Sequence, residues 1–357
     1  MKITFQVFLV CTILLFNAPA RAAFDIQFVD DPGAFFGQYL NSSPEHAVAV
    51  APDGTVYVAY GGDNLYLASR PSGGSWTIET VDTEGITGQY PSIALDSLNR
   101  PHISYHEGYW YDLKYARWTG TSWLVETVDD TGSTGQYTAI AVDSNDRPHI
   151  SYHDFGNKNL MYAHWNGSSW NTETVDTAPN VGQYSSIAVD TSNKPHISYY
   201  DWGNSWLRYA HFNGTSWQVE GADISGSAGL YSSIALNSSD RPYISYAASS
   251  QVRYANRDNG ITWQSEIVDT FNPAYISLAM DSTDTPHISY FVQGDADLKH
   301  ARWNGSAWEI ETVDSAGDVG RFSSIFLDSA DVPHISCLLY TSPSPRDRTR
   351  SRMPSSA

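Results

Sequence analysis

The chain has 357 residues and a formal net charge of −19, because 39 acidic side chains outnumber 20 Lys and Arg. So acidic a protein is not expected to bind nucleic acid or to insert into a membrane, and we expect a monomer. Its two cysteines, Cys11 and Cys337, are too few for a disulfide framework or a Cys/His metal site.

Residues 1–22 have the pattern of an export leader. Lys2 precedes an apolar run from Ile3 to Phe16, and the small-residue site Ala20-Arg21-Ala22 ends the segment. The run is short for a membrane span, and nothing later in the sequence resembles one. We therefore expect residues 1–22 to be a signal peptide, and the mature protein to be secreted to a periplasmic or extracellular location.

From residue 23 to residue 340 the chain repeats one unit of about 47 residues. The proline that opens the PHISY motif or its variants recurs at Pro101, Pro148, Pro195, Pro242, Pro286 and Pro333. A tryptophan that closes a turn recurs at Trp76, Trp123, Trp170, Trp217, Trp263 and Trp308. Such regular spacing over most of the chain indicates a repeat architecture in a single domain.

Each unit carries four short runs with the composition of strands. In one copy these are Ser185–Asp190, His196–Tyr200, Leu207–Phe212 and a run that begins at Trp217, each bounded by Gly, Asn, Asp, Ser or Pro. No window has the 3.6-residue apolar period of a helix. Four strands per repeat favour an all-β fold, a seven-bladed β-propeller of four-stranded blades, over a parallel β-helix.

The two ends of the chain are expected to share the last blade. Phe24–Asp30 (FDIQFVD) matches the end of a repeat and arrives before any first strand, so it should pair with strands from the C-terminus and close the ring. The seventh copy breaks off after His334-Ile335-Ser336, so this composite blade is expected to be incomplete. Residues 341–357 look like a translated sequencing adapter; the alternative is a genuine basic, disordered tail.

Residues that recur in every blade are interpreted as scaffold. The PHIS histidines are His102, His149, His196, His287 and His334. Five equivalent histidines around a ring cannot all be one catalytic base, and alternation places each beside a serine of the same strand, such as His196 and Ser198. We expect a structural hydrogen-bond set that resembles the His–Ser–Trp–Asp arrangement of WD40 blades.

One turn resembles a known motif. Asp258-Asn259-Gly260-Ile261-Thr262-Trp263 is similar to the Asp-box of the BNR, sialidase-type propellers, and other copies keep only its Gly-x-Ser-Trp or Gly-x-Ala-Trp end. In that family the Asp-box is a structural turn remote from the active site, so the resemblance implies the fold and not the enzyme. The three arginines that those enzymes use to bind a carboxylate have no convergent counterpart in this sequence.

The positions that differ between copies are the candidates for function. Trp110, Trp202 and Trp206 are the tryptophans outside the repeated turns, and all lie in loops between second and third strands. Aromatic rings beside carboxylates suit sugar binding, since sugar ring faces stack on aromatics and hydroxyl groups bond to polar atoms. The predicted ligand-binding residues are Tyr109, Trp110, His153, Asp154, Tyr200, Asp201, Trp202 and Trp206. The alternative is that these aromatics pack the loops.

The sequence favours a binding module for a glycan over an enzyme. The alternatives are a propeller-type glycoside hydrolase or lyase that uses Glu107, His153, Asp154 or Asp201, and a scaffold for a protein partner. No cofactor is expected. Asp129-Asp130 and the pair Asp295 and Asp297 offer oxygen ligands for Ca²⁺, although no regular spacing supports such a site.

Overall fold

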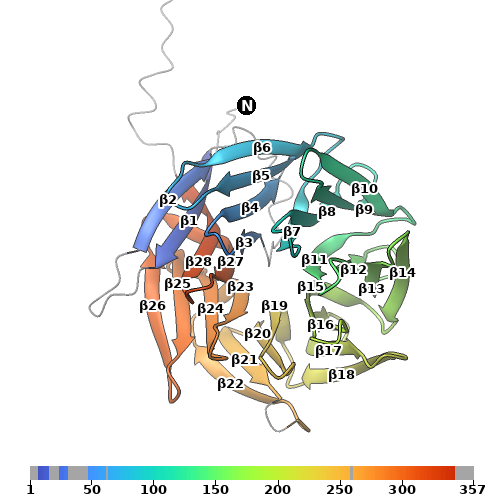
Figure 1. Cartoon of the computed structure of the whole chain (residues 1–357). Helices are drawn as coiled ribbons and strands as arrows, with labels where there is room; N and C mark the ends of the chain where they lie inside the picture. Colours follow the sequence, from blue (N-terminus) through green and yellow to red (C-terminus); the bar gives the residue numbers. More distant parts are fainter. Residues whose placement is uncertain (1–6, 16–23, 31–46, 62, 258–259, 342–357) are drawn as a thin grey trace, which may run out of the picture.

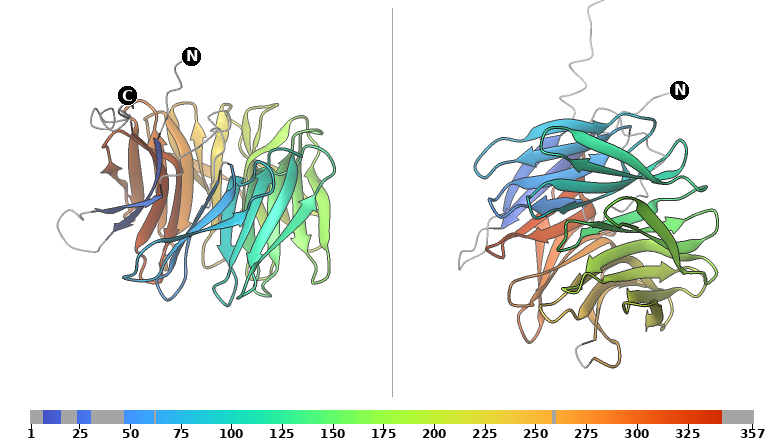
Figure 2. Two further views of the ribbon diagram at one scale, coloured as in Figure 1. Left: turned by 90° about the horizontal axis from the view of Figure 1, so that it is seen from above. Right: turned by 45° about the vertical axis from the view of Figure 1, so that its right-hand side comes forward.

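A computed structural model describes residues 7–15, 24–30, 47–61, 63–257 and 260–341. They form a ring of β-sheets around an open centre (Figure 1). Figure 2, in which the ring is also seen from its side, shows the strands running along the axis, so that the connecting loops lie on two opposite faces. The tail 342–357 and the leader residues 1–6 and 16–22 lie outside the described residues.

Six blades are each built from four consecutive antiparallel strands, in sequence order from the centre outwards (Figure 1). Blades one to six are β3–β6 (Val48–Val50, Val56–Gly61, Leu65–Arg70, Thr77–Asp82), β7–β10 (Gln89–Leu95, Pro101–Glu107, Asp112–Trp118, Trp123–Asp129), β11–β14 (Gln136–Val142, Pro148–Asp154, Asn159–Trp165, Trp170–Asp176), β15–β18 (Val181–Val189, Pro195–Asp201, Trp206–Phe212, Trp217–Asp223), β19–β22 (Ala228–Leu236, Pro242–Ala248, Gln251–Asn256, Gln264–Asp269) and β23–β26 (Pro273–Met280, Pro286–Val292, Asp297–Trp303, Trp308–Asp314).

The prediction of a seven-bladed propeller with an incomplete last blade is wrong. Six blades are built from the repeats, and the sheet that closes the ring has four strands in the order β2-β1-β28-β27. Its strands are β1 (Val7–Leu15), β2 (Phe24–Asp30), β27 (Asp318–Leu327) and β28 (Pro333–Thr341).

The error comes from the segment assigned to the leader. Strand β1 pairs with β28 over Val7–Leu14, and on its other side it pairs with β2, so β2 does not reach the C-terminal strands directly. An apolar run rich in β-branched residues has strand-forming chemistry as well as leader chemistry, and sequence alone does not separate the two. Cleavage of residues 1–22 stays a prediction.

The blades pack face to face, which buries both faces of their inner strands. All seven residues of β12 are buried, and in the outermost strand of the same blade, β14, only the last two are. Apolar residues such as Ile150 and Tyr152 fill the layers between neighbouring blades. This two-sided burial explains why the second strands do not alternate between apolar and charged residues.

A buried tyrosine latches each of blades two to six to the blade before it. The hydroxyl of a second-strand tyrosine donates to the aspartate that ends the preceding blade's outermost strand, at 2.6 Å in every case. These Tyr–Asp latches are Tyr105–Asp82, Tyr152–Asp129, Tyr199–Asp176, Tyr246–Asp223 and Tyr290–Asp269. Burial, together with the nearby carboxylate, raises the pKa of Tyr199 well above its usual range, so the phenol stays a neutral donor.

The same contacts close the ring. A serine hydroxyl of one inner strand accepts the backbone N–H of the next, as Ser92 Oγ does from Ile140 at 3.1 Å. The closing sheet repeats this pattern, because Ser324 Oγ accepts the N–H of Ala47 at 2.9 Å. Tyr60 also donates to Asp30 of β2 at 2.6 Å. Blade one is therefore held to the closing sheet by the bonds that join any two blades.

No helix in the described part of the chain is long and apolar enough to cross a membrane.

Candidate ligand-binding face

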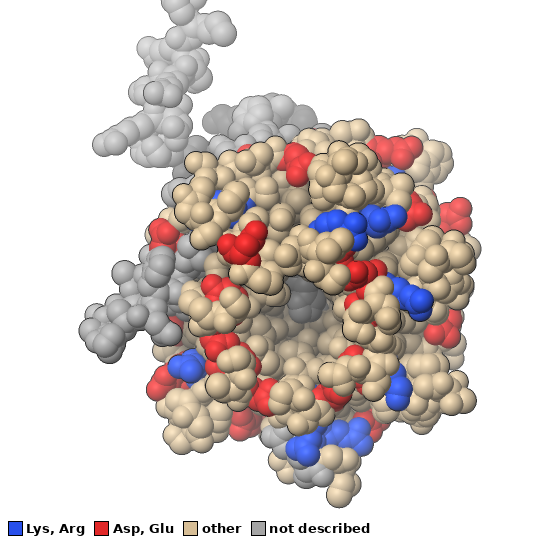
Figure 3. Space-filling model, viewed as in Figure 1, with Lys and Arg blue, Asp and Glu red and all other residues tan. Residues whose placement is uncertain are grey.

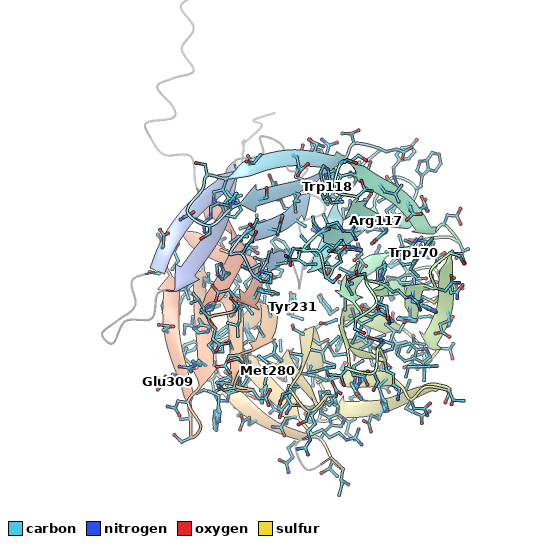
Figure 4. All side chains as sticks on the ribbon, in the orientation of Figure 1. Arg117, Trp118, Trp170, Tyr231, Met280 and Glu309 are labelled. Atoms are coloured by element: carbon cyan, nitrogen blue, oxygen red, sulfur yellow. The ribbon has the colours of Figure 1, made fainter. Side chains whose placement is uncertain are left out.

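The innermost strands begin with an aromatic collar around the centre of the ring. Its members are Tyr90, Tyr137, Tyr184, Tyr231, Tyr275 and Phe322, and their successive ring centroids lie 4.4–5.2 Å apart. Figure 4 shows the Tyr231 side chain near the open centre. All six have positive φ angles of 51–57° at a break in strand register. A bulge of this kind re-aims one side chain, which here turns the ring to the axis.

Aromatic contacts lead outward from the collar along three consecutive blades. In blade three, the His153 ring lies 6.1 Å from Tyr137 and 6.3 Å from Phe155 of the loop between second and third strands. In blade four, Tyr200 lies 6.4 Å from Tyr184 and 5.9 Å from Trp202. Blade two repeats the arrangement with Tyr90, His106 and Tyr111. Because these loops follow the second strands, they lie on the face that holds the collar.

The outer ends of these contacts are exposed to solvent. Trp110 is 69% exposed, Tyr109 61%, Trp202 58% and Phe155 56%. Tyr109 and Trp110 also contact each other edge to face at 4.7 Å. Three of the predicted site residues, Tyr109, Trp110 and Trp202, therefore lie in an exposed aromatic set on neighbouring blades. We call Tyr109, Trp110, Tyr111, Phe155 and Trp202 the aromatic loop face.

The sequence analysis missed Phe155 and included Trp206, whose position is different. Trp206 is only partly exposed and begins β17, where it pairs with Asp201 across the hairpin. Phe155 follows Asp154 in blade three, at the place that Trp202 occupies after Asp201 in blade four. Alignment of the repeats carries that signal, but a search for unusual tryptophans alone does not.

The carboxylates predicted at the site are buried and hold the loops. Asp154 accepts from the backbone and side chain of Asn157 at 2.9 and 2.7 Å. Asp201 accepts from the N–H of Asn204 at 2.9 Å and from Arg208 Nε at 2.6 Å. Groups whose lone pairs are taken by loop amides and a guanidinium are positioning residues for the loops.

Glu107 has the same function in blade two. Its two carboxylate oxygens accept the N–H groups of Tyr109 and Trp110, at 2.7 and 2.5 Å. Glu107 is 1% exposed, so it sits under the loop whose aromatic tips it orients. The carboxylates that were candidates for catalysis thus accept hydrogen bonds from the backbone of the loops that carry the aromatic loop face.

His153 is a buried neutral imidazole. Burial lowers its pKa to about 4, against the smaller opposing effect of Asp154. Gln183 Nε2 lies 3.4 Å from His153 Nε2, and His153 Nδ1 has no hydrogen-bond partner among the described residues. His153 is therefore uncharged at neutral pH, and one of its ring nitrogens can form a further hydrogen bond.

The PHIS histidines do take part in repeated hydrogen bonds, but their partners differ from the expected ones. His196 Nδ1 lies 2.5 Å from the Tyr209 hydroxyl of the third strand, and its Nε2 lies 3.6 Å from Asp190. The strand serine instead bonds across to the next blade, as Ser198 does to Ser232. His196 and Ser198 lie on the same face of the strand because they are two residues apart. They are at different positions along the strand, so each contacts a different partner.

The remaining sequence motifs have structural or untested places. Trp263 of the Asp-box-like turn donates to Glu220 at 3.2 Å, a contact that other blades repeat, while Asp258 and Asn259 lie outside the described residues. The described residues contain no group of three or more His, Cys, Asp or Glu side chains placed to hold a metal ion. Asp129 accepts from Tyr152 in a Tyr–Asp latch. Calcium binding remains a prediction.

The face of the ring seen in Figure 3 is hollowed at its centre. Acidic side chains lie around this hollow, and basic side chains are also present between it and the outer edge (Figure 3). The hollow on this face therefore has acidic side chains near its rim and basic side chains further out.

Comparison with known proteins gives the fold. No family model matches the sequence, and no curated protein matches it. A polysaccharide lyase, an ulvan lyase bound to -[GlcA(1-4)Rha3S]-, is similar with a TM-score of 0.60 and 15% identity, over 88% of this chain and 97% of that one. Virginiamycin B lyase from Staphylococcus aureus has a TM-score of 0.57 and 12% identity, over 93% and 99%.

A mutant of AofleA from Arthrobotrys oligospora is also similar, with a TM-score of 0.53 and 14% identity over 77% of this chain and 89% of that one. Sequence identities this low carry over the architecture and not the activity. The predicted all-β propeller is confirmed in its coarse form, and its blades carry an aromatic loop face on one side.

Proposed function

We propose that this protein is an exported glycan-binding module whose ligand lies across the aromatic loop face of blades two to four. The observation that carries the proposal is the exposure of Trp110, Tyr109, Trp202 and Phe155 on three consecutive loops. Large exposed aromatics grouped on one face of a soluble protein mark interaction sites. Sugar rings present apolar faces that stack on such side chains.

The buried layer beneath supports a preformed site. Glu107, Asp154 and Asp201 each fix the backbone of a loop through two or more hydrogen bonds. A surface held in this way loses little conformational entropy when a ligand binds. The ulvan lyase, which has a similar fold, is bound to the saccharide -[GlcA(1-4)Rha3S]-, and this also supports the proposal. The turn similar to the Asp-box is consistent with the same broad group of propellers.

A lyase is the second candidate, and His153 is the observation in its favour. Its neutral imidazole has an unpaired Nδ1 and contacts the collar residue Tyr137. A hydrolase is less well supported, because Asp154 and Asp201 are occupied by loop amides and Arg208. Cleavage of an acidic polysaccharide with formation of an unsaturated product absorbing in the ultraviolet, lost in His153→Ala, would favour the lyase over the binding module.

The test of the binding proposal is affinity electrophoresis and calorimetry with a panel of neutral and uronic polysaccharides. The double variant Trp110→Ala/Trp202→Ala should weaken binding by at least about fivefold, since each lost stacking contact is worth roughly 0.5–1.5 kcal/mol. Leu98→Ala is the matched control, because Leu98 is 66% exposed but lies in the turn between the first two strands of blade two, on the opposite face.

Unchanged affinity in the double variant would refute this placement of the site. Binding of a protein ligand that no sugar competes for would instead favour the scaffold alternative. Export is part of the proposal. It predicts that the protein is recovered outside the cytoplasm with residues 1–22 removed. Because β1 comes from those residues, a retained N-terminus would contradict the leader and keep β1 between β2 and β28.

A further inference from the structure

A second feature lies between blades two and three, at the ends of the strands away from the aromatic loop face. At most interfaces the tryptophan that begins the outermost strand of one blade donates its Nε1–H to a glutamate of the preceding blade. These Trp–Glu bonds are Trp123–Glu79 at 3.0 Å, Trp217–Glu173 at 3.1 Å, Trp263–Glu220 at 3.2 Å and Trp308–Glu266 at 3.0 Å. The bond fastens the outer edges of neighbouring blades.

The interface between blades two and three lacks this bond. The equivalent donor, Trp170 Nε1, is buried without a hydrogen-bond partner among the described residues. The equivalent acceptor is Glu126, which the Trp170 indole does not reach. An unpaired buried donor costs free energy comparable to a lost hydrogen bond. Among the described residues Trp170 shares this state with Trp76 of blade one, whereas the other four equivalent tryptophans are paired.

A cavity of about 240 Å³ lies at this opened interface. Its walls include Tyr115, Arg117 and Glu126 from blade two, and Trp165 and Trp170 from blade three. In Figure 4 the labelled side chains of Arg117 and Trp170 lie on these two neighbouring blades. The cavity is smaller than the roughly 300–1,000 Å³ usual for drug-sized ligands, which restricts it to a small molecule or a single residue of a polymer.

Two charged side chains of opposite sign line the cavity without an ion-pair partner among the described residues, whereas the wall carboxylate of Asp146 accepts from the N–H and the hydroxyl of Ser97, both at 2.7 Å. No carboxylate among the described residues lies within ion-pair distance of Arg117, and Glu126 is therefore not its partner either. The other cation in the walls, Arg100, is already held by Asp96 at 2.6 Å. Arg117 offers several N–H donors, Glu126 offers acceptors, and Trp170 adds one further donor. Between them stand the rings of Tyr115 and Trp165.

The next interface shows which of these properties belong to the repeat and which do not. A cavity of about 430 Å³ lies between blades three and four, at the equivalent place. There His164 replaces Arg117 and Phe212 replaces Trp165, and Trp217 keeps its bond to Glu173 at 3.1 Å. A hollow between blades is thus a general property of the repeat. Of these two cavities, the one between blades two and three has Arg117, Glu126 and the unpaired Trp170 in its walls.

We propose that this opened inter-blade cavity is a second binding site, for a single neutral sugar residue. Neighbouring hydroxyl groups both donate and accept, so they match an arginine and a carboxylate side by side, and Trp170 Nε1 satisfies one more oxygen. The aromatic walls suit the apolar face of a pyranose. The charges of Arg117 and Glu126 cancel, and the net charge of −19 disfavours an anionic ligand.

The site is independent of the aromatic loop face, and the experiment keeps the two apart. Saturation-transfer NMR and tryptophan fluorescence titrations are made on the full chain with neutral hexoses, deoxyhexoses and pentoses, and with glucuronic acid as the charged comparator. At least one neutral sugar should saturate the protein and outcompete glucuronic acid. Arg117→His, which copies the residue of the next blade, should weaken that binding at least tenfold, and Glu126→Gln should weaken it severalfold.

Two controls locate the effect. Arg302→His changes the same repeat position in blade six and should leave binding unchanged, as should Trp110→Ala/Trp202→Ala on the other face. Thermal unfolding midpoints of all variants establish that they fold. The proposal is overturned if no neutral monosaccharide binds saturably at millimolar concentration, if glucuronic acid binds more tightly, or if Arg117→His and Glu126→Gln both bind as the wild type does.

Discussion

Blades four and five have the same interior and different loops. In both, a buried second-strand tyrosine donates to the aspartate of the preceding blade at 2.6 Å, Tyr199 to Asp176 and Tyr246 to Asp223. At the end of that strand blade four has Asp201 and the exposed Trp202, whereas blade five has Ala248 and a serine turn. The comparison separates what the blades share for packing from the exposed aromatic loops that blades two to four carry.

The largest effect should come from the part that the two blades share. Asp176→Ala and Asp223→Ala each leave a buried tyrosine without its carboxylate partner; Arg253 also loses its ion pair with Asp223, whereas Arg208 keeps Asp201. Breaking a buried charged network by removing one partner costs about 3–5 kcal/mol. Denaturant unfolding should give similar losses for both variants. A loss below about 1 kcal/mol in either blade would show that the Tyr–Asp latch is not a common device.

An intermediate effect is expected from the part that differs. Asp201→Ala copies blade five and removes the acceptor of Asn204 and Arg208, although Arg208 keeps Asp176 at 3.1 Å. We expect a loss of roughly 1–3 kcal/mol in stability and increased hydrogen exchange confined to residues 202–205.

The reciprocal change Ala248→Asp provides the control. Blade five lacks the asparagine that donates hydrogen bonds to the carboxylate in blade four, so this variant should gain no stability. A gain in stability, or faster exchange throughout blade four in Asp201→Ala, would contradict the assignment of Asp201 to the loop alone.

The smallest effect concerns the histidine of blade four, which blade five replaces with Tyr243. Burial lowers the pKa of His196 below its usual value of 6.5, so the unfolded chain binds a proton more readily than the folded one. The stabilising effect of neutral His196 is complete above pH 6.5 and is lost as the pH falls below that value, by at most about 1.4 kcal/mol per pH unit.

His196→Tyr should therefore flatten part of the decline of unfolding free energy between pH 6.5 and pH 5, measured by urea titration at several pH values. The other PHIS histidines keep the remaining slope, since burial also lowers the pKa of His149 and His287, to about 4 in each. An unchanged slope in the variant would mean that His196 does not titrate between the two states.

The repeat made the blades predictable, because turn residues and strand composition recur at a fixed period. It also singled out Trp110 and Trp202, which the structure places in exposed loops, and it predicted repeated hydrogen bonds of the PHIS histidines, although with other partners. It could not assign β1, because an apolar run that reads as a leader can equally pair as a strand. It could not find the cavity beside Arg117, since the absence of one Trp–Glu bond is visible only in three dimensions.

The sequence analysis did not single out the collar, because residues that recur between blades are interpreted as scaffold. Its placement depends on a backbone bulge with a positive φ angle, which no side-chain pattern announces. The predicted carboxylate site failed for a related reason. Sequence shows that Asp154 and Asp201 are unusual, but only hydrogen-bond geometry shows that their lone pairs are already used.

The collar makes the width of the central opening adjustable in small steps. Blades two to six and the closing sheet each contribute one described ring, and Phe322 shows that the ring need not carry a hydroxyl group. A substitution at one collar position would change one sector of the opening and leave the Tyr–Asp latches of that blade in place. Substitutions in the collar could thus change the size or the polarity of the central opening one residue at a time, without a change of fold.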